Sequence, residues 1–286
     1  MVVKVEVIGG DLGMRLRSGR PVEQYGQFVL VCDGTGQIVL CIDEAVLTSV
    51  PKHDKRPRFA ALVESPAIPC VRRAMKVLRD NPRRLLQRYR RIYTCDPTLA
   101  AVHLRICQSP VANSWIRSPA LCSKTKLVSM ITSNKVGSPL QQQRVRFARQ
   151  MRSALDLYGR GFNRIDHKED GLREYMFSVA IENIQWPGYH TEKIVDCFLM
   201  GTVPIYCGDP LIGKVFNTDG ILMLGPNTPP PTAALYQKML PAVRDNFKRA
   251  QAYRTGYEQS LLTDILATLP TSSQVAAPIA TSTVSV

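Results

Sequence analysis

The stretch YMFSVAIENIQWPGYHTEKIVDCFLMGTVPIYCGD, at residues 175–209, constrains the fold of this chain more than any other segment. Its first part, from Met176 to Ile181, is rich in β-branched and aromatic residues, which is typical of a strand buried in a parallel sheet. A Pro-Gly loop follows, and Thr191 can cap the next helix. That helix has an apolar face formed by Ile194, Phe198 and Leu199. Gly201 ends it before a second apolar run, so the stretch predicts a strand–helix–strand unit.

Polar side chains gather at one edge of this predicted unit. In parallel sheets, ligands bind at the carboxyl ends of the strands and at the start of the helix that follows. The side chains expected at that edge are Glu182, Asn183, Tyr189, Glu192 and Lys193. Any one of them could simply cap or solvate a loop, but their occurrence together predicts a ligand site.

The order I-E-N…G-Y-H-T-E-K-I…G-T-V-P-I-Y-C-G resembles the donor-binding signature of glycosyltransferase family 10, the α-1,3/1,4-fucosyltransferases. It is most similar to the soluble forms of bacteria and large DNA viruses. Weaker similarity extends from about Glu64 to Gly220. Two positions depart from the family: Cys207 stands where the family usually has Trp, and His190 stands where it usually has a hydrophobic residue.

The resemblance implies an α/β fold of the GT-B type, with two Rossmann-like α/β domains facing across a cleft. We expect residues 1–117 to bind the acceptor and residues 118–267 to bind the nucleotide sugar, while residues 268–286 form a disordered tail. Within the first domain, Asp33-Gly34-Thr35-Gly36 between two apolar runs predicts a hairpin. Near the end of the second, Pro241 predicts that residues 233–267 form two helices.

The resemblance also implies an inverting displacement at the anomeric carbon of a GDP-sugar, with GDP-L-fucose as the donor and a glycan as the acceptor. The Glu-Ser-Pro element at Glu64 supplies a carboxylate that is a candidate catalytic base, although glutamate beside proline is also common in solvated loops. The sequence has no D-x-D, and its four histidines do not cluster with carboxylates. We therefore expect no metal ion and no cofactor.

Without a metal ion, protein cations would balance the leaving diphosphate. Arg144, which fits the family's R-x-x-F spacing, and Lys193 are the predicted pair, although a solvated helical arginine is the plainer interpretation of Arg144. Glu192 would accept hydrogen bonds from ribose or sugar hydroxyls, and Asn183 and Tyr189 would bind phosphate or base. Lys168 is a weaker candidate for the family's lysine before the central strand.

The formal net charge of +14 would attract nucleic acid, an anionic membrane or a nucleotide sugar. Nine of the cations lie between Arg72 and Arg91, opposed only by Asp80, with Pro82 between two apolar patterns. Two short amphipathic helices with basic outer faces are the favoured interpretation. The alternative is a surface that binds anionic lipid or an acidic acceptor. No nucleic-acid-binding motif accompanies the segment, so we expect no specific nucleic-acid partner.

Eight scattered cysteines without a C-x-x-C pair are typical of reduced core cysteines. The N-terminus lacks a signal-peptide pattern, and no uncharged apolar run approaches the roughly 20 residues of a membrane span. A cytoplasmic location, peripheral at a membrane through the Arg72–Arg91 segment, is expected. Two other functions remain open: a transferase that uses another nucleotide sugar such as GDP-mannose, and a basic polyanion-binding protein on a decayed transferase fold. The presence of both Glu192 and Lys193 argues against a decayed transferase site.

Overall fold

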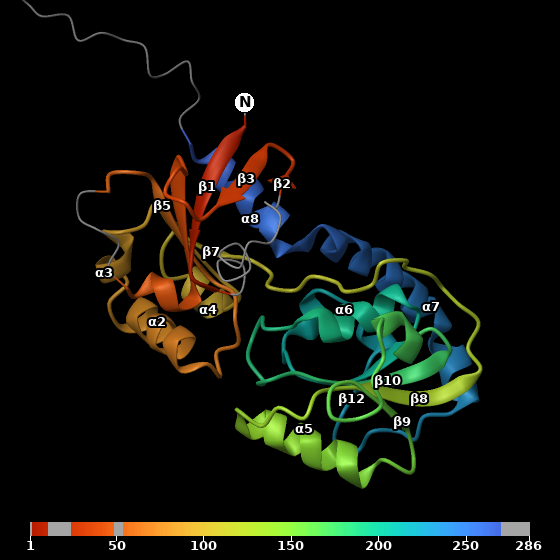
Figure 1. Cartoon of the computed structure of the whole chain (residues 1–286). Helices are drawn as coiled ribbons and strands as arrows, with labels where there is room; N and C mark the ends of the chain where they lie inside the picture. Colours follow the sequence, from red (N-terminus) through yellow and green to blue (C-terminus); the bar gives the residue numbers. More distant parts are fainter. Residues whose placement is uncertain (1, 11–23, 49–53, 270–286) are drawn as a thin grey trace, which may run out of the picture.

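Two α/β domains make up the computed structural model, which describes residues 2–10, 24–48 and 54–269 (Figure 1). From residue 270 on, the predicted tail lies outside the described residues. The first domain contains a seven-stranded sheet in the order β2-β3-β1-β4-β5-β6-β7. The strands are β1 (Val3–Ile8), β2 (Gln24–Tyr25), β3 (Phe28–Val31), β4 (Ile38–Ile42), β5 (Arg58–Leu62), β6 (Arg91–Thr94) and β7 (Ile106–Gln108).

The predicted hairpin between β3 and β4 does not form, because β1 lies between these strands and pairs in parallel with both. The connecting loop crosses the face of β1 at Glu6. Its carboxylate accepts hydrogen bonds from the backbone N–H groups of Gly34 and Gly36, at 2.9 and 3.3 Å. A Cβ at Gly36 would lie 2.4 Å from the Glu6 nitrogen, so only glycine fits this crossing. Pairing with a strand distant in sequence thus overrides the local turn signal.

Helices cover both faces of the first sheet. One face packs against α2 (Pro69–Asp80), α3 (Arg83–Leu86) and α4 (Pro97–Ala100), with the short helix η1 (Asp43–Val46) at its edge. The α2 and α3 pair confirms the two amphipathic helices predicted around Pro82. The other face packs against Leu261, Leu262 and Ile265 of α8 (Gly256–Ala267), at the opposite end of the chain.

The second domain contains a parallel sheet in the order β12-β11-β10-β8-β9. Its strands are β8 (Lys126–Ile131), β9 (Asp156–Tyr158), β10 (Tyr175–Ile181), β11 (Val203–Cys207) and β12 (Leu222–Met223). One face packs against α6 (Glu192–Leu199), and the other packs against α5 (Pro139–Gln150) and α7 (Ala233–Ala250). Four short 3-10 helices complete it: η2 (Lys168–Gly171), η3 (Ile212–Lys214), η4 (Thr218–Gly220) and η5 (Gln251–Thr255). The predicted strand–helix–strand unit is β10-α6-β11.

The chain crosses between the domains twice. Residues 109–125 lead from β7 to β8, and the C-terminal helices lead back, as the blue ribbon in Figure 1 shows. We expected residues 118–267 to stay in the second domain, but α8 packs on the first sheet. Asp264 accepts hydrogen bonds there from Arg91 Nη1 at 2.7 Å and from the Tyr93 hydroxyl at 2.6 Å. The apolar face of α8 covers β-strand side chains that would otherwise be exposed to water.

Candidate active site

The carboxyl ends of strands from both sheets meet at a cavity of about 430 Å³, which we call the cleft cavity. Strand ends of parallel sheets are where such folds bind ligands. The first domain contributes Gly10, Asp43, Glu44, Glu64, Ser65 and the start of α2. The second domain contributes Lys135, Gly137, Ser138, Gln141 and Asn183. Two of the predicted site residues, Glu64 and Asn183, therefore line one cavity from opposite domains.

Glu182, which directly follows β10, holds the start of α6 in place. Its side chain is buried, and its carboxylate accepts hydrogen bonds from the Thr191 N–H at 2.8 Å, the Thr191 hydroxyl, and Lys193 Nζ at 3.0 Å. A Cβ at Gly208 would lie 2.5 Å from Glu182 Cγ, so the loop after β11 needs glycine there. Glu182, the Thr191–Lys193 segment and Gly208, which come from three separate parts of the sequence signature, therefore lie together and hold one another in place.

Lys193 and Glu192 belong to a chain of alternating charges. Glu192 Oε1 lies 3.8 Å from Lys193 Nζ and 3.4 Å from Lys168 Nζ, and Lys168 reaches Asp196 at 2.9 Å. Burial alone would raise the pKa of Glu192, but the two lysine charges outweigh it and lower that pKa to about 2. Glu192 is therefore an acceptor-only carboxylate at neutral pH. Sequence reasoning missed Asp196, which looks like an ordinary position in the middle of a helix.

Arg144 is buried rather than solvated. Its guanidinium donates from Nη1 to the Ile181 carbonyl and to Asn183 Oδ1, both at 3.1 Å. Burial lowers its pKa from the ordinary value, and Nε has no hydrogen-bond partner among the described residues. The helix that carries it, α5, begins at Ser138, whose hydroxyl donates to the Asn183 carbonyl at 2.9 Å. The structure thus brings the predicted residues Arg144 and Asn183 together at the end of β10.

Tyr189 lies in the loop that packs the second domain against the first. It is buried with Cys95 and Val111, and burial raises its pKa well above the ordinary value, while a hydrogen bond with Ser65 acts in the opposite direction. Two neighbouring residues fix the same loop. A Cβ at Gly188 would lie 2.1 Å from the Cys95 carbonyl oxygen, and the Trp186 Nε1 donates to Asp96 at 3.0 Å. Tyr189 therefore faces the Glu64–Ser65 side of the cleft.

The first-domain side of the cleft cavity holds two contrasting carboxyl groups. Glu64, just after β5, is exposed, and the one hydrogen bond that its side chain accepts from the described residues is long, from the Ser65 N–H at 3.4 Å. Asp43, at the end of β4, is 2% exposed and accepts hydrogen bonds from the N–H groups of Val63 and Glu64. Sequence reasoning selected Glu64 and missed Asp43. The signal for Asp43 is a carboxylate directly after an apolar strand, IVLCID.

Residues 121–216 match the model of a protein family described as glycosyltransferase family 10 (fucosyltransferase), C-terminal part. An alpha-(1,3)-fucosyltransferase of Helicobacter pylori is 44% identical over 57 residues, which are 20% of this chain and 12% of that protein. The family 10 match thus contains the charge network around Glu182 and lies in the second domain, while most of that relative's length is unmatched.

Two solved structures show the fold of the whole chain. An α1,3-fucosyltransferase crystallised with GDP has a TM-score of 0.52 at 17% identity, with 93% of this chain and 88% of that chain covered. AviGT4, a glycosyltransferase involved in avilamycin A biosynthesis, has a TM-score of 0.53 at 10% identity, with 93% and 96% covered. The predicted GT-B arrangement is confirmed: the segment similar to family 10 lies in the second of two α/β domains, each built on a mainly parallel sheet.

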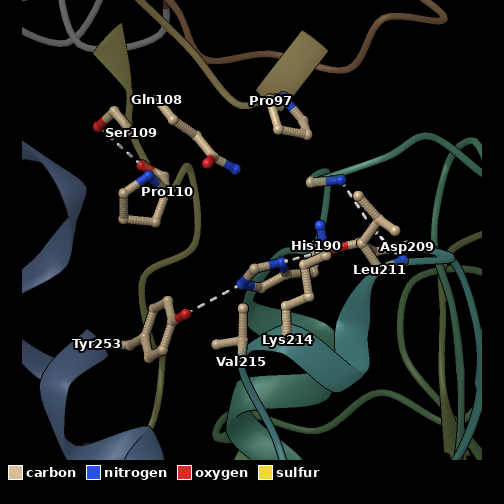
Figure 2. Close-up of a pocket in the computed structure, with 11 residues that line it drawn as sticks. Pro97, Gln108, Ser109, Pro110, His190, Asp209, Leu211, Lys214, Val215 and Tyr253 are labelled. Carbon is tan, nitrogen blue, oxygen red and sulfur yellow. Dashed lines mark hydrogen bonds and ion pairs between the residues drawn. The ribbon is translucent and has the colours of Figure 1, made fainter. Parts of the chain in front are cut away.

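The structure shows what surrounds Cys207 and His190, the two residues that depart from the usual family 10 signature. Cys207 ends β11 and packs against the core between the sheet, α5 and α7, and burial raises the pKa of its thiol. His190 is buried between Asp209, at 3.3 Å from Nδ1, and the Tyr253 hydroxyl, at 3.1 Å from Nε2, as Figure 2 shows. These groups line a second cavity of about 370 Å³ between the domains, which we call the hinge cavity. It contains none of the predicted site residues.

Four further observations concern the predicted partners, cofactors and location. Seven cations of the Arg72–Arg91 segment are exposed: Arg72, Arg73, Lys76, Arg79, Arg83, Arg84 and Arg90. All eight cysteines, each within the described residues, are free. In the part of the chain that the structure describes, no group of three or more His, Cys, Asp and Glu side chains is arranged to hold a metal ion. Within the same residues, every helix is too short or too polar to cross a membrane.

Proposed function

We propose that this protein transfers L-fucose from GDP-fucose to a hydroxyl group of a glycan, with inversion at the anomeric carbon and without a metal ion. The observation that carries the proposal is the bonded unit of Glu182, Thr191 and Lys193, which fixes the start of α6 inside the segment that matches family 10. A preformed helix start beside fixed cations suits a diphosphate.

Donor binding follows from the second-domain groups. Lys193 carries three N–H donors, of which two are used by Glu182 and Thr191, so the third is available to a diphosphate oxygen. The unpartnered Nε of Arg144 identifies a second donor beside Asn183. Glu192, held ionised by Lys193 and Lys168, accepts hydrogen bonds from ribose or sugar hydroxyls. The two cations, Lys193 and Arg144, balance the negative charge that develops on the leaving GDP.

Acceptor activation belongs to the first domain. As the acceptor oxygen bonds to the anomeric carbon, the bond from that carbon to the diphosphate oxygen breaks and GDP leaves with the electron pair. A first-domain carboxylate takes the hydroxyl proton, and Glu64 is the residue that the sequence predicts for this role. Its placement on the cleft cavity, opposite Asn183, supports a position between acceptor and donor.

Thermal unfolding with nucleotides tests the proposal before any acceptor is known. A ligand that binds the native state stabilises it by RT ln(1 + [L]/Kd), so GDP and GDP-fucose should raise the Tm more than UDP-sugars do. An equal shift with GDP-mannose would instead support the alternative donor. Shifts with heparin or DNA and none with any sugar nucleotide would contradict the transferase and favour the polyanion-binding alternative.

A matched pair of lysine variants sharpens this test. Lys193→Gln removes the charge but keeps a donor for Glu182, so the protein should fold and lose its GDP-dependent shift. Lys248→Gln, on the exposed side of α7, should keep the full shift. If both variants respond to GDP as the native protein does, Lys193 has no part in donor binding.

We further propose that the exposed cations of α2 and α3 bind an anionic membrane surface. These helices keep their apolar residues in the core, as Val71, Met75 and Leu85 show, and direct their cations to solvent. Such a surface attracts anionic lipid headgroups with an energy of about 1 kcal/mol per cation near the membrane.

A further inference from the structure

Asp43 combines several uncommon features at one position. It directly follows β4 and has a φ of +51°. No other non-glycine residue among those described has a left-handed backbone conformation. Aspartate tolerates this region better than most residues, yet the conformation still costs energy, and such residues concentrate at functional sites. Its Oδ1 accepts the N–H groups of Val63 and Glu64 at 2.8 and 3.1 Å. The carboxyl group is thereby fixed against the end of β5.

The second oxygen of this carboxyl group has no partner. Asp43 Oδ2 is buried and makes no hydrogen bond among the described residues. It faces Gly10, where an added Cβ would lie 3.5 Å away, and both residues line the cleft cavity. A buried polar atom without a partner is costly, by about 1–3 kcal/mol. A ligand hydroxyl that enters the cavity can satisfy it, because the cavity also reaches Ser138 and Asn183 on the donor side.

We propose that Asp43, rather than the exposed Glu64, takes the proton of the acceptor hydroxyl; this inference rests on the proposed function. Oδ2 accepts the O–H hydrogen while the acceptor oxygen forms its bond to the anomeric carbon and GDP departs with the electron pair of the broken bond. The proton ends on Asp43 and the two negative charges balance: one carboxylate is neutralised as one phosphate oxygen gains charge. Glu64, at the solvent side of the cavity, binds another acceptor hydroxyl.

The surroundings of Asp43 suit this role. Burial, reinforced by the charges of Glu64 and Glu44, raises the pKa of Asp43 to about 7, near the value at which a general base is most effective. Activity should therefore rise with pH through about 7. The other titratable groups that face Asp43 or the cavity beside it are Cys70 of α2, Cys95 after β6 and Lys135 of the second domain. Burial raises the pKa of Cys95 to about 12, so that thiol stays neutral in this range.

Asp43→Asn tests the proposal with little disturbance of the fold. Asparagine keeps an oxygen for Val63 and Glu64 and tolerates the left-handed conformation, but it cannot take a proton. The measurement is GDP release from GDP-fucose between pH 5 and 9, with water alone and with lactose, N-acetyllactosamine or N-acetylglucosamine as probes. Glu64→Gln is the comparison, and Asp80→Asn on the outer face of α2 is the control. GDP-dependent stabilisation is recorded for each variant.

We expect Asp43→Asn to lower the rate by about 10²–10⁴-fold, the usual contribution of a general base, and to remove the rise through pH 7 while GDP still stabilises it. Glu64→Gln should lower the rate by less than about tenfold and keep the pH profile. The proposal is overturned if Asp43→Asn keeps the native rate and profile, or if it loses GDP stabilisation together with the rate. A native protein that neither releases GDP nor is stabilised by it overturns the proposed function, and this inference with it.

Discussion

The two sides of the cleft differ in how their carboxylates are paired. On the second-domain side, the Glu182 carboxylate is bonded to Thr191 and Lys193, and Lys193 continues into a chain of charges through Glu192. On the first-domain side, Asp43 has an oxygen without a partner among the described residues, and Glu64 faces solvent. The carboxylates of the second-domain side are thus held in place without a ligand, whereas under the proposed function the hydroxyls of the acceptor complete the first-domain side. Polar side chains that are already paired hold a ligand in a precise position, whereas a carboxylate without a partner is available to react with the ligand.

The paired side should be the more damaging one to break. Glu182→Ala leaves the Lys193 ammonium without its buried partner, so we expect a loss of about 3–5 kcal/mol in the free energy of unfolding, measured by urea denaturation. Glu174→Ala removes an exposed pair with Lys126, 2.9 Å apart, and should cost about 0–1 kcal/mol. Equal losses in the two variants would mean that Glu182 does not organise the site.

The effect of Asp43 on the free energy of unfolding should depend on pH. The pKa of Asp43 lies above its ordinary value of 3.8, at about 7, so the folded state binds more protons than the unfolded state between these pH values. The protonated Asp43 carboxyl therefore contributes fully to the stability of the folded state below pH 4, and this contribution is lost as the pH rises to about 7. Asp43→Asn should gain stability relative to the native protein across this window, by roughly 4 kcal/mol at most.

Urea denaturation at several pH values measures this difference, and Asp80→Asn serves as the control because Asp80 is exposed on α2. A difference between Asp43→Asn and the native protein that stays constant from pH 4 to 8 would show that Asp43 titrates normally.

The hinge cavity provides a test outside both sides of the cleft. His190→Val restores a hydrophobic residue but leaves the Asp209 carboxylate and the Tyr253 hydroxyl without their shared partner. We expect a loss of about 1–3 kcal/mol in thermal or urea unfolding, and about 1 kcal/mol for Tyr253→Phe. Nucleotide-induced stabilisation should be unchanged in both, since the hydrogen bonds between these side chains do not involve Lys193 or Arg144. If either variant lost the GDP response, the hinge cavity would also contribute to nucleotide binding.

The smallest effect on folding is expected at the basic face. Replacing Arg72, Arg73, Lys76 and Arg79 of α2 by Gln should change the free energy of unfolding by less than about 0.5 kcal/mol. Retention on phosphatidylserine vesicles should nevertheless fall, and added salt should weaken it in the native protein. Phosphatidylcholine vesicles are the lipid control. The control variant replaces four second-domain cations: Arg146, Arg149, Arg152 and Lys248. If it loses retention equally, total charge rather than the α2 face is responsible.

Local patterns predicted the strand–helix–strand unit of the second domain well. Strand, cap and apolar helix face follow one another within residues 175–209, so β10, α6 and β11 could be placed from sequence. The polar residues at their ends then had to share one edge of the sheet. The partners within that edge could not be foreseen: that Lys193 bonds to Glu182, and that Arg144 is buried beside Asn183, depend on how loops from separate strands close.

Features that depend on pairing between distant segments were not predictable. The glycine-rich run at residues 33–36 is a good hairpin signal, yet β1 inserts between the strands it joins. Pro241 lies inside α7, and the break between the helices falls at η5 instead, because Met239, Ala242 and Val243 are buried against the second domain. Asp43 was overlooked since nothing local distinguishes its buried carboxyl from the exposed one of Glu64.

The return of α8 to the first sheet means that the first domain is discontinuous in the chain. Residues 256–267 are synthesised after the whole second domain, and they cover apolar side chains of β1, β3 and β4. Translation at about 5–20 residues per second leaves that face open for roughly ten seconds or more after β6 is made, while the second domain is synthesised. Completion of the first domain therefore waits until the second domain has been synthesised, and a chaperone that binds nascent chains has its natural target on this sheet.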